Sequence, residues 1–253
     1  MHCLSYVALI LEWLGYPNQA LQKSHEALIL AQDLSHPYTL AVALFFAAWL
    51  HYSRREVRES QERAKAAVTL STEHGFPFWL GAGTMLWGWA LVKQGQGEEG
   101  MARIRQGLAT YRATGAEQWR PCSFALLGEA CREIGQVDEG LHVLAEALAM
   151  VDKNAERLWE AELYRLQGEL LLRQAATNGQ QSEICFRQAL DVARRQQAKS
   201  LELRVATSLS RLWQQQGKCQ EAYDLLAPIY GWFTEGFDTT DLQEAKALLD
   251  ALT

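Results

Sequence analysis

Residues 4–27 read LSYVALILEWLGYPNQALQKSHEA, two apolar stretches on either side of Gly15. Small residues stand at Ala8, Ala20 and Ala27 among larger apolar side chains. Apolar residues that recur every three or four positions predict amphipathic helices, whereas strands would show strict alternation. The stretch therefore predicts two antiparallel helices that are joined by a turn at Gly15 and approach closely where the side chains are small.

This pattern of small residues returns along the chain at intervals of 40 residues. The residues aligned with Ala8 are Ala48, Gly88, Gly128 and Gly168. In the C-terminal part the interval becomes 42 residues, where Ser210 continues this series and Ser182 continues the series of Ala20, so we expect a two-residue insertion within 175–179. Repeats of this length predict a solenoid, because each helix pair buries its apolar surface only by stacking on its neighbours.

The predicted fold is all-α, a right-handed superhelical solenoid of about six antiparallel helix pairs that forms one domain over residues 1–253. A single amphipathic stretch follows the sixth pair, with the apolar stripe Leu242, Ala245, Leu248 and Leu252, and predicts a C-terminal capping helix over about 240–252. The expected pairs lie at about 1–36, 37–76, 77–116, 117–156, 157–198 and 199–236.

Composition and charge exclude several classes of protein. The chain has 24 Lys and Arg against 30 Asp and Glu, a net charge of −6, which argues against nucleic acid as the main partner. Five cysteines, an odd count without CxxC spacing, predict a reducing, cytoplasmic location. The longest apolar run, residues 40–50, is shorter than the roughly 20 residues that span a membrane, so we expect no membrane association.

Motifs of catalysis and cofactor binding are missing from the sequence. The stretch Gly95-x-Gly97-x-x-Gly100 matches a dinucleotide-binding fingerprint, but a helical pattern precedes it instead of a strand, and Glu98 and Glu99 would face phosphate with the wrong sign. No phosphate loop, HExxH or GxSxG motif occurs. We therefore expect no enzyme, no catalytic residues, no cofactor and no metal site.

The repeat register resembles that of the tetratricopeptide repeat. Leu4, Val7, Ala8 and Leu11 occupy the motif's first-helix positions, and Gly15, Ala20 and Ala27 its turn and second-helix positions. The interval departs from the usual length of about 34 residues, and Arg55 stands where the other turns have glycine. HEAT and armadillo repeats also run near 40 residues, but they do not explain this spacing of small residues as well.

A second resemblance concerns the C-terminal part. Residues 212–252 include LWQQQGK, LLAPIYGWFTEGFDT and LQEAKALL, and residues 162–169 read ELYRLQGE. These segments look like the end of large bacterial signalling proteins that join a class III adenylate or guanylate cyclase domain, a predicted ATPase domain and a tetratricopeptide tail. The resemblance implies a regulatory tail, and the catalytic residues of the cyclase and the ATPase are not in this sequence.

On the tetratricopeptide register, the residues aligned with Ser5, Leu9, Glu12 and Trp13 face a concave groove. The groove is predicted to be aromatic in its N-terminal half and charged in its C-terminal half. Its candidate binding residues are Trp13, Phe45, Trp49, Tyr52, Met85, Trp89, Glu129, Arg132, Arg165, Glu169 and Arg211. Aromatic residues at helical spacing are also typical of a core, so Trp49 and Trp89 belong either to the groove or to the contacts between repeats.

The favoured function is a non-catalytic interaction module that binds a peptide or protein segment, including a neighbouring domain of the same polypeptide. Aromatic side chains would anchor the segment, and arginines would orient its carboxylates. One alternative is a helical-repeat domain that senses a small molecule in the aromatic half and thereby controls oligomerisation. Another is a scaffold that self-associates into a homo-oligomer through its first pair.

Overall fold

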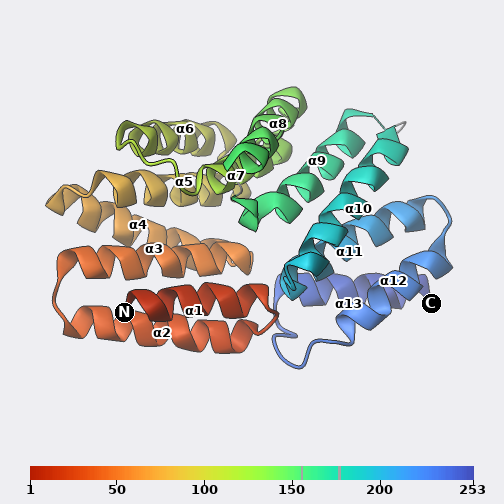
Figure 1. Ribbon diagram of the computed structural model, residues 1–253, viewed down its shortest axis with the longest axis horizontal. Helices are drawn as coiled ribbons and strands as arrows, with labels where there is room; N and C mark the ends of the chain where they lie inside the picture. The colour runs from red at the N-terminus through yellow and green to blue at the C-terminus, as the bar shows by residue number, and fades with distance from the viewer. Residues whose placement is uncertain (155, 176–177) are drawn as a thin grey trace.

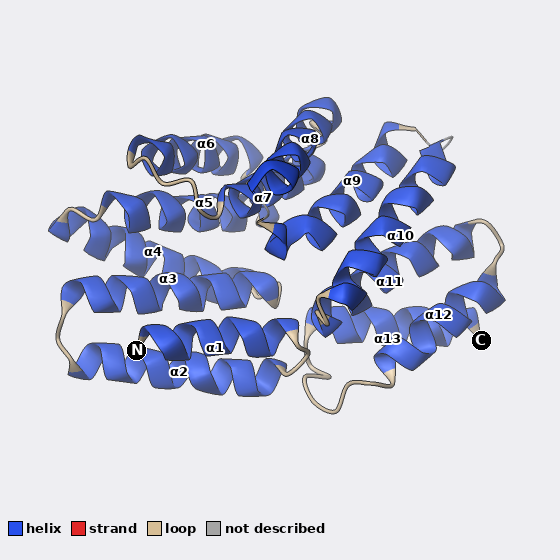
Figure 2. Cartoon of the chain, in the orientation of Figure 1, coloured by secondary structure: helices blue, strands red, loops and turns tan. Residues whose placement is uncertain are grey.

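The computed structural model describes residues 1–154, 156–175 and 178–253. Within these ranges the chain forms thirteen α-helices, one short 3₁₀ helix and no strand (Figure 2). The first three pairs are α1 (His2–Trp13) with α2 (Pro17–Asp33), α3 (Pro37–Ser53) with α4 (Val57–His74), and α5 (Pro77–Lys93) with α6 (Gly97–Ala113).

The remaining helices continue the same order. They are α7 (Arg120–Ile134) with α8 (Val137–Asn154), the 3₁₀ helix η1 (Arg157–Trp159), α9 (Glu160–Gln174) with α10 (Gly179–Arg195), α11 (Lys199–Gln215) with α12 (Cys219–Tyr230), and the single helix α13 (Thr240–Leu252). The prediction of an all-α solenoid of helix pairs with a terminal helix is confirmed. The predicted insertion within 175–179 involves residues 176 and 177, which lie outside the described residues.

Small residues hold the two helices of a pair at close range. A Cβ atom built on Gly88 in α5 would lie 2.6 Å from the carbonyl oxygen of Gly100 and 2.8 Å from the amide nitrogen of Ile104, both in α6. Gly107 meets the backbone of Gly81 in the same way. These distances leave no room for a side chain, so the small residues that repeat in the sequence are contact points between helix backbones.

One apolar core runs through the first four pairs and reaches α9, and two further clusters of buried apolar residues lie among the helices from α9 to α13. α3 and α5 are apolar around most of their circumference, because helices on both sides cover them, and each buries twelve of its seventeen residues. In the described part of the chain, no helix is both long enough and apolar enough to cross a membrane.

The pairs follow a curved path that brings the last helices back to the first pair (Figure 1). The loop between α12 and α13 reaches the turn between α1 and α2, where the carboxylate of Glu235 accepts hydrogen bonds from the backbone amides of Asn18 (2.9 Å) and Gln19 (3.2 Å). The Trp232 ring packs against Gly15, whose missing side chain makes the space for it. The superhelix is therefore closed on itself and is not an open rod.

The close backbone contact at Gly88 generates a prediction. Gly88→Ala should lower the free energy of unfolding by about 1–3 kcal/mol, because the added methyl group must push α5 and α6 apart. Urea denaturation followed by circular dichroism measures this change. Gly179→Ala is the control, since Gly179 is the first residue of α10 and the nearest atom to a Cβ there is 3.6 Å away. Equal midpoints for the two variants would mean that helix spacing tolerates a larger residue.

Candidate functional site

The first helices of all pairs except α5 line two hollows inside the closed superhelix. The first, called here the charged pocket, is a cavity of about 230 Å³. The second, called here the aromatic chamber, is a cavity of about 280 Å³. Side chains from non-consecutive pairs line both, so both depend on the closure of the fold.

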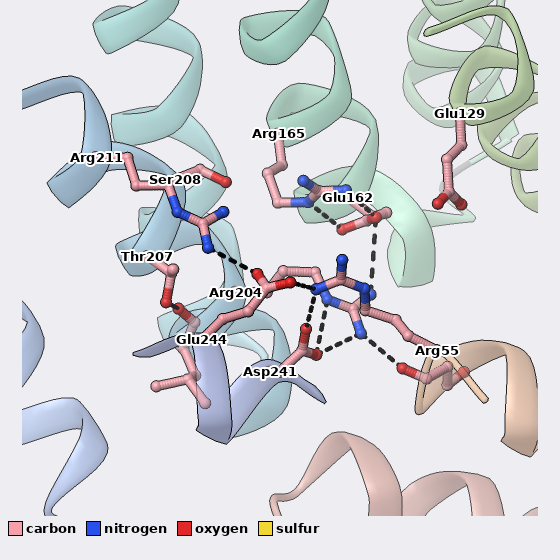
Figure 3. A network of polar contacts seen from close by, with 12 residues as sticks. Arg55, Glu129, Glu162, Arg165, Arg204, Thr207, Ser208, Arg211, Asp241 and Glu244 are labelled. Carbon is pink, nitrogen blue, oxygen red and sulfur yellow. Dashed lines mark hydrogen bonds and ion pairs between the residues drawn. The ribbon is translucent and has the colours of Figure 1, made fainter. Parts of the chain in front are cut away.

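The charged pocket collects side chains from α3, α7, α9, α11, α13 and the turn after α3. Its lining contains six arginines and five carboxylates, together with a phenol and two hydroxyls. The residues are Tyr52, Arg55, Glu129, Arg132, Glu162, Arg165, Glu169, Arg173, Arg204, Thr207, Ser208, Arg211, Asp241 and Glu244. Figure 3 labels ten of them, which come from α7, α9, α11, α13 and the turn after α3.

A hydrogen-bonded network on α9 forms one wall of the charged pocket. Arg165 donates two hydrogen bonds to Glu162, of 2.7 Å from Nε and 2.6 Å from Nη2, and a third to Glu169. Glu169 also accepts from Arg132 on α7 and from the hydroxyl of Ser208 on α11 (2.9 Å). The network joins three neighbouring pairs through one carboxylate.

Arg204 on α11 connects the two ends of the superhelix. Its guanidinium donates to Oδ2 of Asp241 on α13 (2.9 Å from Nε) and to the carbonyl oxygen of Ser53 at the end of α3 (2.6 Å). Its Nη1 also lies 3.8 Å from Glu162 (Figure 3). This largely buried cation of the sixth pair therefore contacts the second and fifth pairs and the terminal helix.

The ion pairs of Arg55 explain why the turn after α3 has an arginine where the equivalent turns have glycine. Its φ of 63° lies in the left-handed region that Gly15 (90°) and Gly95 (83°) occupy in the equivalent turns. A residue with a side chain is strained there, by about 1 kcal/mol or more. The guanidinium pairs with Asp241 (3.2 Å) and Glu244 (2.9 Å), so the side chain offsets this strain with a second link to α13.

Arginines favour the ionised form of two carboxylates of the charged pocket. Burial opposes the charge of Asp241, but Arg204 and Arg55 outweigh it and hold its pKa below the usual value. Burial likewise opposes the charge of Glu162, and Arg165 outweighs it and lowers the pKa. Burial raises the pKa of the Tyr52 phenol, whose hydroxyl donates to Glu129 (3.2 Å). At neutral pH the pocket is thus an array of fixed charges.

Two arginines at the rim of the charged pocket form fewer ion pairs with the described residues than the other four do. In the described part of the chain Arg173 forms no ion pair, and its guanidinium donates to the carbonyl oxygen of Arg132. Arg211 pairs with Glu244 (2.8 Å), and nearly half of its side chain is exposed. These two guanidinium groups retain donors that face solvent.

The aromatic chamber lies between α1, α3, the start of α7 and η1. Its walls are Tyr6, Leu9, Ile10, Trp13, Phe45, Phe46, Trp49, Trp119, Cys122, Leu158 and Trp159. Trp159 meets Trp49 edge to face, with ring centroids 5.1 Å apart, and meets Trp13 in the same way at 5.8 Å. The indole of Trp159 thus joins the fifth pair to the first two across the interior.

The structure divides the predicted groove residues into three groups. Tyr52, Glu129, Arg132, Arg165, Glu169 and Arg211 line the charged pocket. Trp13, Phe45 and Trp49 line the aromatic chamber. Met85 and Trp89 reach neither hollow. The side chain of Trp89 is 1% exposed and its ring packs against that of Tyr52, while Met85 packs against Gly107 of α6. They are core residues: Met85 lies where α5 meets α6, and Trp89 lies where α5 meets α3.

Several residues of the two hollows were not among the candidates. Asp241 and Glu244 lie on α13, which the repeat register treats as a cap, and Trp119 and Trp159 precede the helices to which the groove positions belong. The unusual arginine at position 55 was the one sequence signal for the contact with α13.

The fold is that of a TPR-like helical repeat. The chain is similar to aspartyl phosphate phosphatase F from Bacillus subtilis (TM-score 0.62, 11% identity, covering 89% of this chain and 57% of the phosphatase). It is also similar to the apo form of RapI (TM-score 0.60, 12% identity, covering 98% of this chain and 94% of RapI). A third similar structure is a putative kinesin light chain of Podosopora anserina with nearly identical TPR-like repeats (TM-score 0.52, 20% identity, covering 78% of this chain and 95% of that one). At these identities the likeness shows the fold alone. No family model and no curated protein matches the sequence.

Glu12, near the closure of the superhelix, is a buried carboxyl group with an incomplete set of partners. Its Oε2 accepts no hydrogen bond from the described residues, and Arg54 Nη1 lies 3.9 Å away. Burial raises the pKa of Glu12 to about 7, although Arg54 opposes the change. The backbone carbonyl of the same residue accepts a hydrogen bond from Ser200 on α11, so this carboxyl lies at a contact between the two ends.

The raised pKa of Glu12 predicts a pH dependence of stability. The folded chain binds this proton up to about pH 7, whereas the unfolded chain releases it near the ordinary value of 4.5, so the wild-type protein loses stability as the pH rises between these values. Glu12→Gln removes the ionisation and should raise the Tm at pH 8 by several degrees, at about 2–4 °C per kcal/mol. The gain should vanish toward pH 5.

Calorimetric scans from pH 5 to pH 8.5 measure this difference. Glu59→Gln, on the exposed face of α4, is the control and should leave the pH dependence unchanged. A Tm difference between Glu12→Gln and wild type that stays constant across this range would contradict the assignment.

Proposed function

We propose that the chain is a non-catalytic interaction module that binds an acidic peptide or protein segment at the charged pocket. The observation that carries the proposal is the pair Arg173 and Arg211, whose donors face solvent at the rim of this pocket. Arginine binds carboxylates in a planar, bidentate geometry, which gives specificity as well as affinity. TPR-like folds are typical of protein–protein interaction, which supports this general class.

The local charge supports an acidic partner. The chain as a whole has more acidic than basic residues, 30 against 24, yet the charged pocket has six arginines against five carboxylates. The interior is thus a locally basic site in an acidic protein, and such a field attracts and orients carboxylates. A cavity of about 230 Å³ holds a few side chains, so the occupant is a short segment and not a folded domain.

A finer proposal places this module as the regulatory tail of a larger bacterial signalling protein with cyclase and ATPase domains. It rests on the sequence resemblance of residues 162–169 and 212–252. If it holds, the acidic segment would come from a neighbouring domain of the same polypeptide. The full reading frame of the gene tests it: a frame that encodes neither domain would contradict it.

Reversal of the two rim charges tests the binding proposal. A short fluorescein-labelled peptide with adjacent aspartates among Gly and Ser should bind the wild-type protein, and its lysine counterpart should not. Arg173→Glu combined with Arg211→Glu should weaken the acidic peptide about tenfold or more, since each hydrogen bond to a charged group contributes about 1.5–3 kcal/mol. Fluorescence anisotropy measures the affinities, and circular dichroism checks the fold.

Arg58→Glu is the matched control, because Arg58 is an exposed arginine on α4 whose partner is Glu62 in the next turn. It should leave the affinity within about twofold. Equal binding of the acidic and basic peptides, or equal losses in the control and the double variant, would contradict a site at the charged pocket.

A further inference from the structure

The aromatic chamber has a chemistry opposite to that of the charged pocket. None of its eleven lining residues is charged. The thiol of Cys122 is satisfied within the wall, since Sγ donates to the carbonyl oxygen of Trp119 at 2.8 Å, and burial raises the pKa of this thiol, so it stays protonated. An occupant would meet carbon surfaces and aromatic ring faces almost everywhere.

This lack of polar partners restricts the occupant. A peptide backbone in the chamber would lose hydrogen bonds to water and find few replacements, and each buried unsatisfied group costs about 1–3 kcal/mol. A carboxylate or ammonium group would lose more. The chamber therefore favours an uncharged molecule without a main chain.

The volume and the wall geometry restrict it further. The cavity of about 280 Å³ is roughly twice the size of the cavities of about 150 Å³ that hold a benzene ring. Phe45 and Trp119 are nearly parallel, with centroids 5.9 Å apart and an interplanar angle of 14°, while Trp49 and Trp159 meet edge to face. These rings pack against one another, and the aromatic carbon surface that they present to the cavity suits a planar ring system.

The mouth of the chamber is open and apolar. Tyr6 and Ile10 on α1 are each 47% exposed, and Leu158 of η1 on the opposite side is 41% exposed. Large apolar side chains that are exposed together at an opening often mark a binding site. They also give an apolar molecule a path into the chamber.

We propose that the aromatic chamber binds a small, uncharged, planar molecule of about the size of two fused aromatic rings. This inference goes beyond the proposed interaction function and does not depend on it, because it concerns a different hollow with different residues. The occupant is a free small molecule and not the aromatic side chain of a bound peptide.

The site also links ligand binding to the closure of the superhelix. Its walls come from the first, second, fourth and fifth pairs, so a bound ring bridges segments as far apart in sequence as Tyr6 and Trp159. A molecule that contacts both sides binds the closed arrangement better than an opened one. Binding therefore stabilises the closed form and raises the Tm.

Titration of the intact protein with 5-fluoroindole, followed by ¹⁹F NMR, tests the proposal. The ligand should bind saturably and raise the Tm, whereas 5-fluoroindole-2-carboxylate, of similar shape but charged, should bind about tenfold more weakly or worse. Ile10→Trp and Leu158→Trp fill the mouth from opposite sides, and each should weaken 5-fluoroindole by about tenfold or more. Ile29→Trp is the matched control: Ile29 is 46% exposed on α2, away from the chamber, and its replacement should change nothing.

The alternative outcomes are separable in the same assay. No saturable binding, equal affinity for the charged analogue, or unchanged affinity in both mouth variants with wild-type thermal unfolding would overturn the proposal. Tighter binding of N-acetyl-5-fluorotryptophan amide than of 5-fluoroindole would also overturn it, because the occupant would then be a peptide side chain. The Arg173→Glu and Arg211→Glu variant should bind 5-fluoroindole like the wild type, so failure of the charged-pocket proposal does not affect this result.

Discussion

The contact of Arg204 with Asp241 and Ser53 is the constraint on which the interior of this molecule depends. Removing a guanidinium and a carboxylate from water costs several kcal/mol, and their attraction does little more than offset that cost. Arg204 therefore contributes to the positions of the helices more than to the free energy of folding. Helices in apolar contact can slide past each other, whereas hydrogen bonds of 2.6–2.9 Å hold them in one position. By joining α11 to the end of α3 and to α13, Arg204 fixes the geometry of a closure to which the contacts of Glu235 and Trp232 with the first pair also contribute.

The repeat, and with it most of the fold, could be read from the sequence because it is local and periodic. Small residues such as Gly88 recur wherever two neighbouring backbones touch, so their spacing records the pairing directly. The closure leaves no such record. Glu235 and Asn18 are 217 positions apart and Arg55 and Asp241 are 186 apart, and these contacts occur once, outside the register. The charged half of the groove was predicted because it follows the register on α7, α9 and α11, while the part supplied by α13 was not.

The aromatic chamber shows how one register position changes its role with its place in the array. Ile10 aligns with Leu50 and Leu170, which are fully buried, and in the fifth pair the covering contact is visible: Leu170 lies against Gly140 of the preceding α8. No helix of the described chain covers α1 in this way, so Ile10 remains 47% exposed and becomes the mouth of a cavity. The repeat register aligns Ile10 with Leu50 and Leu170, and the structure is needed to show that its side chain is exposed in the first pair.

The two hollows are adjacent, and the same closure forms both. The rings of Trp49, in the chamber, and Tyr52, in the charged pocket, are 5.2 Å apart on consecutive turns of α3. An acidic segment at the rim of the pocket and an apolar ring in the chamber would each favour the arrangement in which α1, α3 and the C-terminal helices meet. Linkage then requires that each occupant raise the affinity of the other by the same factor. A charged and an apolar site would thus be coupled without any shared ligand contact, through the one conformation that builds both.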